Sequence, residues 1–200
     1  MKKKAVSLTE LRGLVATCES DLVGRRDRAL LLIGFLGALR RSELVALNIE
    51  HVQFEDEGLR LLIAKSKTDQ EGTGREIGLP ASKQSELCPV LALRAWCDTA
   101  SISSGPIFRR LNRSAKPLST PLTPHSVALI IKRRAELAGL DPSRFAGHSL
   151  RSGFCTAAAR AGVPEYQIAR QSGHKSMQVL RGYVQSGGVF LENAAGKLGL

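Results

Sequence analysis

The sequence predicts an α+β fold that is mainly α-helical and contains a small three-stranded antiparallel sheet. Apolar residues recur at helical spacing through most of the chain, whereas residues 49–80 contain short apolar runs that are typical of strands. Glycine and proline stand between these segments, where turns are expected. With 200 residues and a hydrophobic fraction of 43%, the chain can bury one well-packed core. We therefore interpret residues 1–200 as a single domain.

Helices are expected before the sheet. Residues 7–10, Ser-Leu-Thr-Glu, have the form of a capping box, and the apolar residues that follow predict a first helix. A second helix is expected at about 25–39, and its surface is apolar almost all round, which indicates a buried central helix. Ser42 is expected to cap a short third helix, so Arg40 and Arg41 should lie at the corner between two helices.

Three apolar runs, 51–54, 59–64 and 75–79, are expected to form the sheet. The connection between the second and third runs, KSKTDQEGTG, is polar and contains two glycines, which is typical of a flexible hairpin. It carries Lys65 and Lys67, and a lysine near a hairpin tip can reach a ligand.

The second half of the chain is predicted to be helical again. Pro89 is expected to begin a helix that ends near residue 99, and Thr123-Pro124 begins another that ends near residue 137. Residues 100–120 lie between them and are rich in Ser, Pro, Arg and Lys, so we expect a loop with a short extended segment at 106–108.

The net charge of +11 and the isoelectric point near 10.0 favour a polyanionic partner, and nucleic acid is the first candidate. No run approaches the ~18 apolar residues that a membrane span requires, and no apolar signal region follows the basic residues 2–4. We therefore expect a cytoplasmic protein that associates with nucleic acid and not with a membrane. The four cysteines are widely spaced and lack metal-ligand spacing, so reduced thiols are expected, with no metal site and no cofactor.

The segment 147–183 contains the residues best suited to chemistry. A helix that ends at Gly162 is expected to carry His148 and Arg151, which are three positions apart and would share a helix face. A short helix follows and closes at Gly173, and a last helix near 179–184 carries Tyr183. Two imidazoles, a guanidinium and one phenol can hold a phosphodiester and attack it. Taken singly, each of these residues could equally serve packing or capping.

Further motifs lie upstream of this segment, and all of them follow one another in a characteristic order. GALRRSEL spans residues 37–44, SKT spans 66–68, HSLR spans 148–151, SGH spans 172–174, and Tyr183 follows His174 by nine positions. Together they closely resemble the catalytic domain of the tyrosine recombinases, also called phage integrases, over essentially the whole chain. The other histidines and Tyr166 match nothing in that pattern, and we interpret them as structural or surface groups.

The resemblance implies a role for each matched residue. Arg40 and Arg151 match the two arginines that hold the phosphate, and Glu43 matches the acidic residue that orders the corner near Arg40. Lys67 matches the hairpin lysine, with Lys65 as the alternative. The remaining matches are the histidine that acts as base, the histidine that hydrogen-bonds the phosphate and the tyrosine nucleophile, which are His148, His174 and Tyr183.

The resemblance also implies the reaction and the partners. Tyr183 would form a 3′-phosphotyrosyl link to double-stranded DNA without metal, cofactor or ATP, and a 5′-hydroxyl would then rejoin the strand. The protein would be a homotetramer on DNA and a monomer in its absence, with the apolar tail 187–200 docking in trans. Members usually carry a separate N-terminal domain that binds DNA, whereas this sequence begins at the catalytic domain. Ser172 stands where leucine is common, a difference expected to affect packing more than chemistry.

Two alternatives remain open from the sequence. One is an enzyme resembling type IB topoisomerases, which uses a similar set of residues to relax supercoils, and the other is a DNA-binding module without catalysis. The sequence does not reveal the DNA site, nor whether the role is phage integration, transposition, plasmid resolution or cassette exchange.

Overall fold

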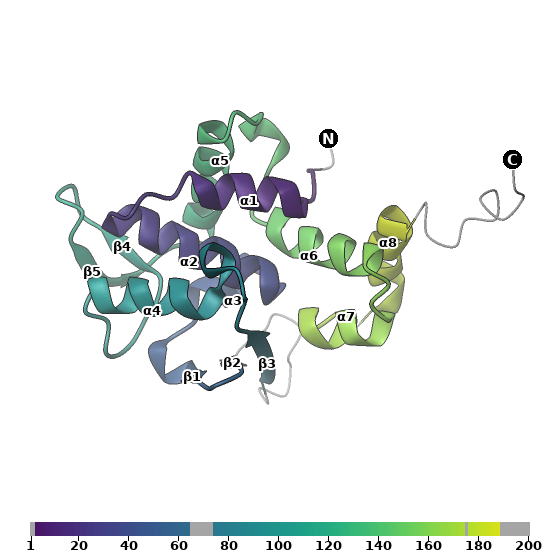
Figure 1. The fold of residues 1–200 in the computed structure, drawn as a ribbon, viewed down its shortest axis with the longest axis horizontal. Helices are drawn as coiled ribbons and strands as arrows, with labels where there is room; N and C mark the ends of the chain where they lie inside the picture. Colours follow the sequence, from purple (N-terminus) through teal and green to yellow (C-terminus); the bar gives the residue numbers. More distant parts are fainter. Residues whose placement is uncertain (1–2, 65–73, 175, 189–200) are drawn as a thin grey trace, which may run out of the picture.

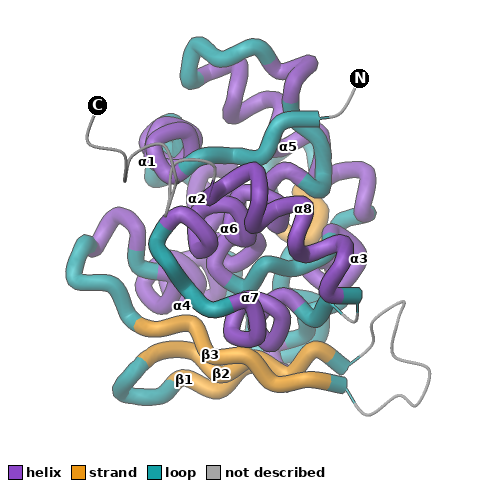
Figure 2. The backbone as a smooth tube through the Cα atoms, turned by 90° about the vertical axis from the view of Figure 1, so that its right-hand side faces the viewer, coloured by secondary structure: helices purple, strands orange, loops and turns teal. Residues whose placement is uncertain are grey.

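The computed structural model describes residues 3–64, 74–174 and 176–188. It shows a helical body with a three-stranded sheet along one side (Figures 1 and 2). In chain order the elements are α1 (Leu8–Ala16), α2 (Leu22–Leu36), α3 (Arg41–Val45), β1 (Val52–Phe54), β2 (Gly58–Ile63), β3 (Arg75–Pro80), α4 (Pro89–Thr99), β4 (Arg109–Leu111), β5 (Pro117–Pro121), α5 (Pro124–Leu137), α6 (Ser149–Arg160), α7 (Glu165–Ser172) and α8 (Met177–Gly188). The predicted α+β class is therefore confirmed.

Helix α2 is the central helix, as predicted, but its bounds differ from the expected 25–39. It begins earlier because the Asp21 side chain accepts a hydrogen bond from the backbone N–H of Gly24 at 2.6 Å and so caps the helix. It ends earlier because the chain turns at Ala38, whose φ of 48° is incompatible with a right-handed helix. The helix packs against α1, α4 and α6.

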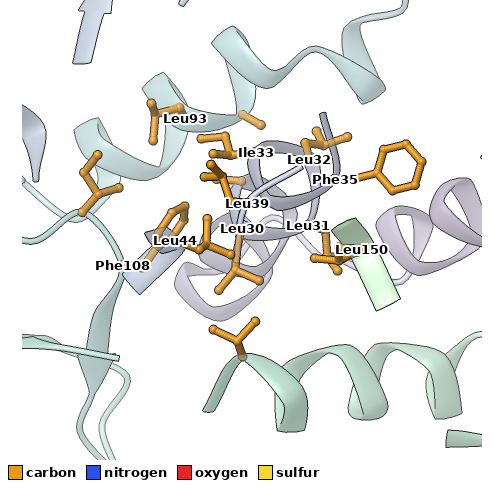
Figure 3. Close-up of a cluster of buried hydrophobic side chains, with 14 of the residues drawn as sticks. Leu30, Leu31, Leu32, Ile33, Phe35, Leu39, Leu44, Leu93, Phe108 and Leu150 are labelled. Atoms are coloured by element: carbon orange, nitrogen blue, oxygen red, sulfur yellow. The ribbon is translucent and has the colours of Figure 1, made fainter. Parts of the chain in front are cut away.

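The main hydrophobic core surrounds α2 (Figure 3). Leucines 30–32 and Ile33 are at most 1% exposed, and α6 contributes Leu150 on the other side. Gly34 permits this close packing, since a Cβ atom there would lie only 2.9 Å from the Leu150 side chain. Trp96 of α4 is fully buried, and its indole N–H donates to the Ile107 carbonyl at 2.9 Å, which satisfies its polar group.

The sheet has the order β1-β2-β3 with antiparallel pairs, so the predicted three-stranded sheet is confirmed. Alternate residues of β2, Leu59, Leu61 and Ile63, point into the core, as the period of a strand requires. Leu59 pairs with Leu79, and Ile63 pairs with Arg75 at the end of the pair where the connection from β2 to β3 begins and ends. This register fixes the position of Arg75.

A second hairpin, β4–β5, was not predicted, and the expectation of a loop at 100–120 was wrong. The expected extended segment at 106–108 lies just before β4. The two strands are short and mostly half-buried or exposed, and Pro117 and Pro121 bound β5. A segment of this kind shows no alternation of apolar and polar residues, so its sequence carries no strand signal.

Helices α6, α7 and α8 pack on one another at the right of Figure 1. Their buried residues form a second, smaller cluster. Helix α7 is also fastened to the rest of the fold, because the Gln171 side chain donates to the Leu36 carbonyl at 2.9 Å and to the Gly78 carbonyl at 3.3 Å. The end of α7 is therefore held beside both α2 and β3.

An ion cluster is buried between α2 and α5. Asp27, 1% exposed, accepts hydrogen bonds from Arg26 at 2.8 Å and from the Arg134 Nε atom at 2.9 Å. Arg134 also donates to the Thr17 carbonyl at 2.8 Å, so it links α5 to the end of α1.

The four cysteines are unpaired and buried: Cys18, Cys88, Cys97 and Cys155. Within the described ranges, no helix is long and apolar enough to cross a membrane.

Candidate active site

The corner between α2 and α3 positions Arg40. Glu43 reaches back to this residue, and its carboxylate accepts the Arg40 backbone N–H at 3.0 Å and the Arg40 Nη1 atom at 2.6 Å. Arg40 is therefore the N-cap of α3, and the prediction that Ser42 caps this helix was wrong. A carboxylate at the third helical position satisfies the N-terminal backbone donor, which makes a serine cap unnecessary.

Arg75 also contacts Glu43, and the sequence did not predict this residue for the site. Its Nη1 and Nη2 atoms lie 3.4 and 3.2 Å from the two carboxylate oxygens of Glu43. Its Nε atom is buried without a hydrogen-bond partner among the described residues. Arg75 is the first residue of β3, and no motif marks it; only the register of the hairpin brings it here.

Glu43 is the anionic centre of the group and is only 2% exposed. Burial raises its pKa, but the hydrogen bond and charge of Arg75, followed by those of Arg40, outweigh burial and lower the pKa below its usual range. Glu43 is therefore ionised at neutral pH and holds two guanidiniums in place.

Arg151 is buried, with 5% exposure, and joins three segments. Its Nη1 atom donates to the Ala38 carbonyl at 2.8 Å and to the Ser172 carbonyl. Its Nη2 atom is buried and has no hydrogen-bond partner in the described part of the chain. Burial first, and then the charge of Arg40, lower the pKa of Arg151 to about 10, so it remains cationic at neutral pH.

His148 is the N-cap of α6 and does not lie within the helix as predicted. His148 is exposed, whereas Arg151 is buried. Partial desolvation lowers the pKa of His148, and the charges of Arg41, Arg151 and Arg40 lower it further. The imidazole is therefore neutral at pH 7 and can accept a proton.

His174 and Tyr183 lie together at the other side of the site. Gly173 ends α7 in the left-handed conformation, with φ of 68°, and turns His174 towards the arginines. The His174 and Tyr183 ring centroids are 5.9 Å apart and their planes meet at 48°. Tyr183 is half-buried on α8.

Ser172 contacts His174, although the sequence suggested that Ser172 would affect packing more than chemistry. The Ser172 side chain is fully buried, and its Oγ atom lies 2.7 Å from Nδ1 of His174, so its effect reaches beyond packing. Burial, followed by the charges of Arg151, Arg40 and Arg75, lowers the pKa of His174 to about 4.

The structure thus gathers most of the predicted site residues from distant parts of the chain. Arg40 and Glu43 come from the α2–α3 corner, Arg151 from α6, and His174 and Tyr183 from the C-terminal helices. Both hairpin lysines, Lys65 and Lys67, lie outside the described residues. Among the residues that are described, no group of three or more His, Cys, Asp or Glu side chains could hold a metal ion.

The arrangement can bind and polarise an anion. Arg40 and Arg75 pair with Glu43 and Arg151 adds a third positive charge, so positive charge is in excess, and two buried guanidinium nitrogens lack acceptors among the described residues. A phosphate oxygen supplies the acceptor that such nitrogens require. A phenol and two imidazoles nearby add the groups needed for nucleophilic attack and proton transfer.

Comparison with known proteins agrees with this site and fold. One similar structure is the XerH site-specific recombinase bound to palindromic difH substrate in a post-cleavage complex. It aligns with a TM-score of 0.76 and 21% identity, and the alignment covers 98% of this chain and 53% of that chain. The XerA recombinase aligns with a TM-score of 0.71 at 19% identity, over 92% of this chain and 59% of that one. The fold is that of tyrosine recombinase catalytic domains.

The sequence comparisons are more specific. The model of the phage integrase family matches residues 4–187, and the chain belongs to this family. It is 46% identical over 180 residues to an integrase/recombinase xerD homolog from Selenomonas ruminantium, covering 90% of this chain and 53% of the relative. It is 28% identical to the tyrosine recombinase XerC of Syntrophus aciditrophicus, covering 82% and 50% respectively. The chain therefore spans about half the length of these curated relatives.

Proposed function

We propose that this chain is the catalytic domain of a site-specific DNA recombinase that cleaves and rejoins DNA strands through a 3′-phosphotyrosyl intermediate. The observation that carries the proposal is the Nη2 atom of Arg151, which is buried without a hydrogen-bond partner among the described residues, in an excess of positive charge and near His174 and Tyr183. Family membership and the recombinases named among the relatives support DNA as the substrate.

Arg40 and Arg151 hold the non-bridging oxygens of the scissile phosphate in this mechanism. These oxygens gain negative charge as the phosphorus is attacked, and planar guanidiniums can follow that change with paired hydrogen bonds. Glu43 keeps Arg40 in position. Loss of one such donor costs ~2.7–4 kcal/mol of transition-state stabilisation by analogy with oxyanion holes.

Tyr183 is the nucleophile. A free phenol has a pKa of ~10, so it must lose its proton at neutral pH, and the neutral imidazole of His148 accepts this proton. The Tyr183 oxygen then bonds to phosphorus while the bond from phosphorus to the 5′ oxygen breaks. Lys67 protonates the leaving oxygen, and His174 hydrogen-bonds the phosphate.

The intermediate conserves the energy of the phosphodiester bond. A 5′-hydroxyl from another strand attacks the phosphotyrosyl link, and the same groups act in reverse, so no ATP is consumed. Arg75, the first residue of β3, lies 3.2 Å from Glu43. The strand that follows the lysine-bearing connection therefore begins at the site, and this supports Lys67 as the proton donor to the leaving oxygen.

The assembly is part of the same proposal. Residues 1–200 form one catalytic domain that works on DNA in the cytoplasm, as a homotetramer on its sites. The tail 187–200 would dock on a neighbouring protomer, and residues 189–200 lie outside the described part of the chain. Deletion of residues 188–200 should abolish synapsis of two DNA sites, and unchanged synapsis would rule out this role of the tail.

A covalent trapping experiment tests the nucleophile. With a nicked suicide DNA substrate, the wild-type chain and Tyr166→Phe should form a covalent protein–DNA adduct, and Tyr183→Phe should form none. Tyr166 is the matched control because it is the only other tyrosine and is 67% exposed. An adduct from Tyr183→Phe would refute the assignment. Strand exchange between two sites, compared with relaxation of a single plasmid, then separates a recombinase from a topoisomerase.

A further inference from the structure

Ser172 contacts two residues of the candidate site at once. Its backbone carbonyl accepts a hydrogen bond from Nη1 of Arg151, and its hydroxyl lies 2.7 Å from Nδ1 of His174. The same hydroxyl lies 2.6 Å from the carbonyl oxygen of Ile168, one turn earlier in α7. Ser172 is completely buried, so water does not compete for these contacts.

The hydrogen bonds of the hydroxyl leave a single consistent arrangement. The carbonyl oxygen of Ile168 can only accept, so the one hydrogen of the Ser172 hydroxyl is donated to it. The hydroxyl oxygen then has only lone pairs to offer to His174. The 2.7 Å contact therefore requires His174 to donate from Nδ1.

We propose that Ser172 is a positioning residue that holds His174 in its Nδ1–H form and leaves Nε2 without a proton in the DNA-free protein. This inference deepens the proposed function, and its second part rests on that function. An unprotonated Nε2 atom cannot donate a hydrogen bond to a phosphate. His174 must therefore take up one proton at Nε2 when the phosphate binds.

The surroundings of His174 make this proton uptake a consequence of anion binding. The ring is neutral in the free protein because it is desolvated and faces positive charge. A bound phosphate offsets that charge and accepts from Nε2. One proton from solvent is then bound at Nε2, Nδ1 keeps its own, and the ring charge rises from 0 to +1. Among the described residues, the titratable or charged groups around the ring and around Ser172 are Arg40, Glu43, Arg75, Arg151, Cys155 and Tyr183.

Nuclear magnetic resonance of the free protein tests the first part. The ¹⁵N shifts of the His174 ring nitrogens should show a protonated Nδ1 and a bare Nε2 at pH 7. Ser172→Ala removes the acceptor that the described residues offer to Nδ1–H, so the ring should change to the Nε2–H form. Ser152→Ala is the matched control, because Ser152 makes the same type of bond to a carbonyl four residues earlier, His148, without touching a ring nitrogen.

The pH dependence of adduct formation on a suicide substrate tests the second part. In the wild-type chain and Ser152→Ala, the rate should fall ~tenfold per pH unit on the alkaline side, the limit for one required proton. In Ser172→Ala the neutral ring can already donate from Nε2, so that decline should be at least threefold shallower per unit. If Ser172→Ala only made the His174 ring less well ordered, the rate of adduct formation would fall by the same factor at every pH.

The outcomes separate the claims. A wild-type ring with Nε2–H, or a Ser172→Ala ring that keeps Nδ1–H, overturns the proposal. The expected tautomers combined with parallel pH profiles overturn only the part concerning proton uptake. Absence of any adduct from the wild-type chain refutes the proposed function and leaves the tautomer result standing.

Discussion

Replacement of Gly173 by alanine should impair the site through a contact that can be calculated from the structure. A Cβ atom at this position would lie 2.9 Å from both Cζ and Nε of Arg75. Ordinary contact begins at 3.4 Å, so the guanidinium must shift by about 0.5 Å. The two hydrogen bonds from Arg75 to Glu43, at 3.4 and 3.2 Å, are already long and have little margin for such a shift.

The substitution has a backbone cost as well, and a matched control isolates it. Gly173 has a φ of 68° and Gly162 has a φ of 74°, so alanine at either site should cost ~1–2 kcal/mol of unfolding free energy. Apart from its two chain neighbours, no described residue has a heavy atom within 4 Å of the Cβ position at Gly162. Gly162→Ala therefore reproduces the strain without touching the site.

Two measurements distinguish the effects. Urea unfolding should show a similar loss of stability for both variants, apart from the added contact in Gly173→Ala. Covalent adduct formation should fall about tenfold in Gly173→Ala alone, since a displacement of 1 Å in a catalytic group can cost ~10²-fold and this one is about half as large. Equal adduct rates in the two variants would show that Arg75 does not support the site.

Two further predictions concern stability. Asp27→Ala should lower the free energy of unfolding by ~3–5 kcal/mol because it leaves Arg26 and Arg134 buried without their carboxylate. Asp98→Ala, at an exposed position, should change the free energy of unfolding little. A small effect of Asp27→Ala in urea unfolding would contradict the buried-charge argument. The folded pKa of His174, about 4, lies below its ordinary value of 6.5, so the unfolded chain binds the extra proton and stability should fall as pH drops from 6.5 towards 4. His174→Gln should reduce this decline in urea unfolding across that range, and the lowered pKa of His148 should account for a remaining part. An unchanged decline in His174→Gln would show that other groups cause it.

Local sequence patterns predicted the elements well where the chain follows simple rules. The capping box at Ser7, the proline starts of α4 and α5 and the alternating strand β2 all gave correct assignments, because each depends on neighbours within one turn or one strand. The same locality explains the Arg40–Glu43 pair, whose members are three residues apart. The β4–β5 hairpin was missed because its proline-bounded, partly exposed strands lack a local signal.

Long-range contacts decided what the motifs could not. Arg75 lies 32 residues from Glu43, and only the register of β2 with β3 brings the two together. His148 was expected inside a helix, but it is the N-cap, since the turn before α6 ends at that residue. No local rule distinguishes these outcomes, because side chains meet according to which segments bury each other.

The sequence alone determined the chemical groups of this protein: the two motif arginines, the carboxylate, the two histidines and the single matching tyrosine, in an order that indicates a phosphodiester-cleaving catalytic domain. The tertiary structure decided their environment. It added Arg75, and it placed the hydroxyl of Ser172 against His174. It also buried one nitrogen of Arg151 without an acceptor in the part of the chain that the structure describes. Burial is the physical reason, since the charge and proton positions of these groups depend on the desolvation and hydrogen bonds that only the packed chain provides.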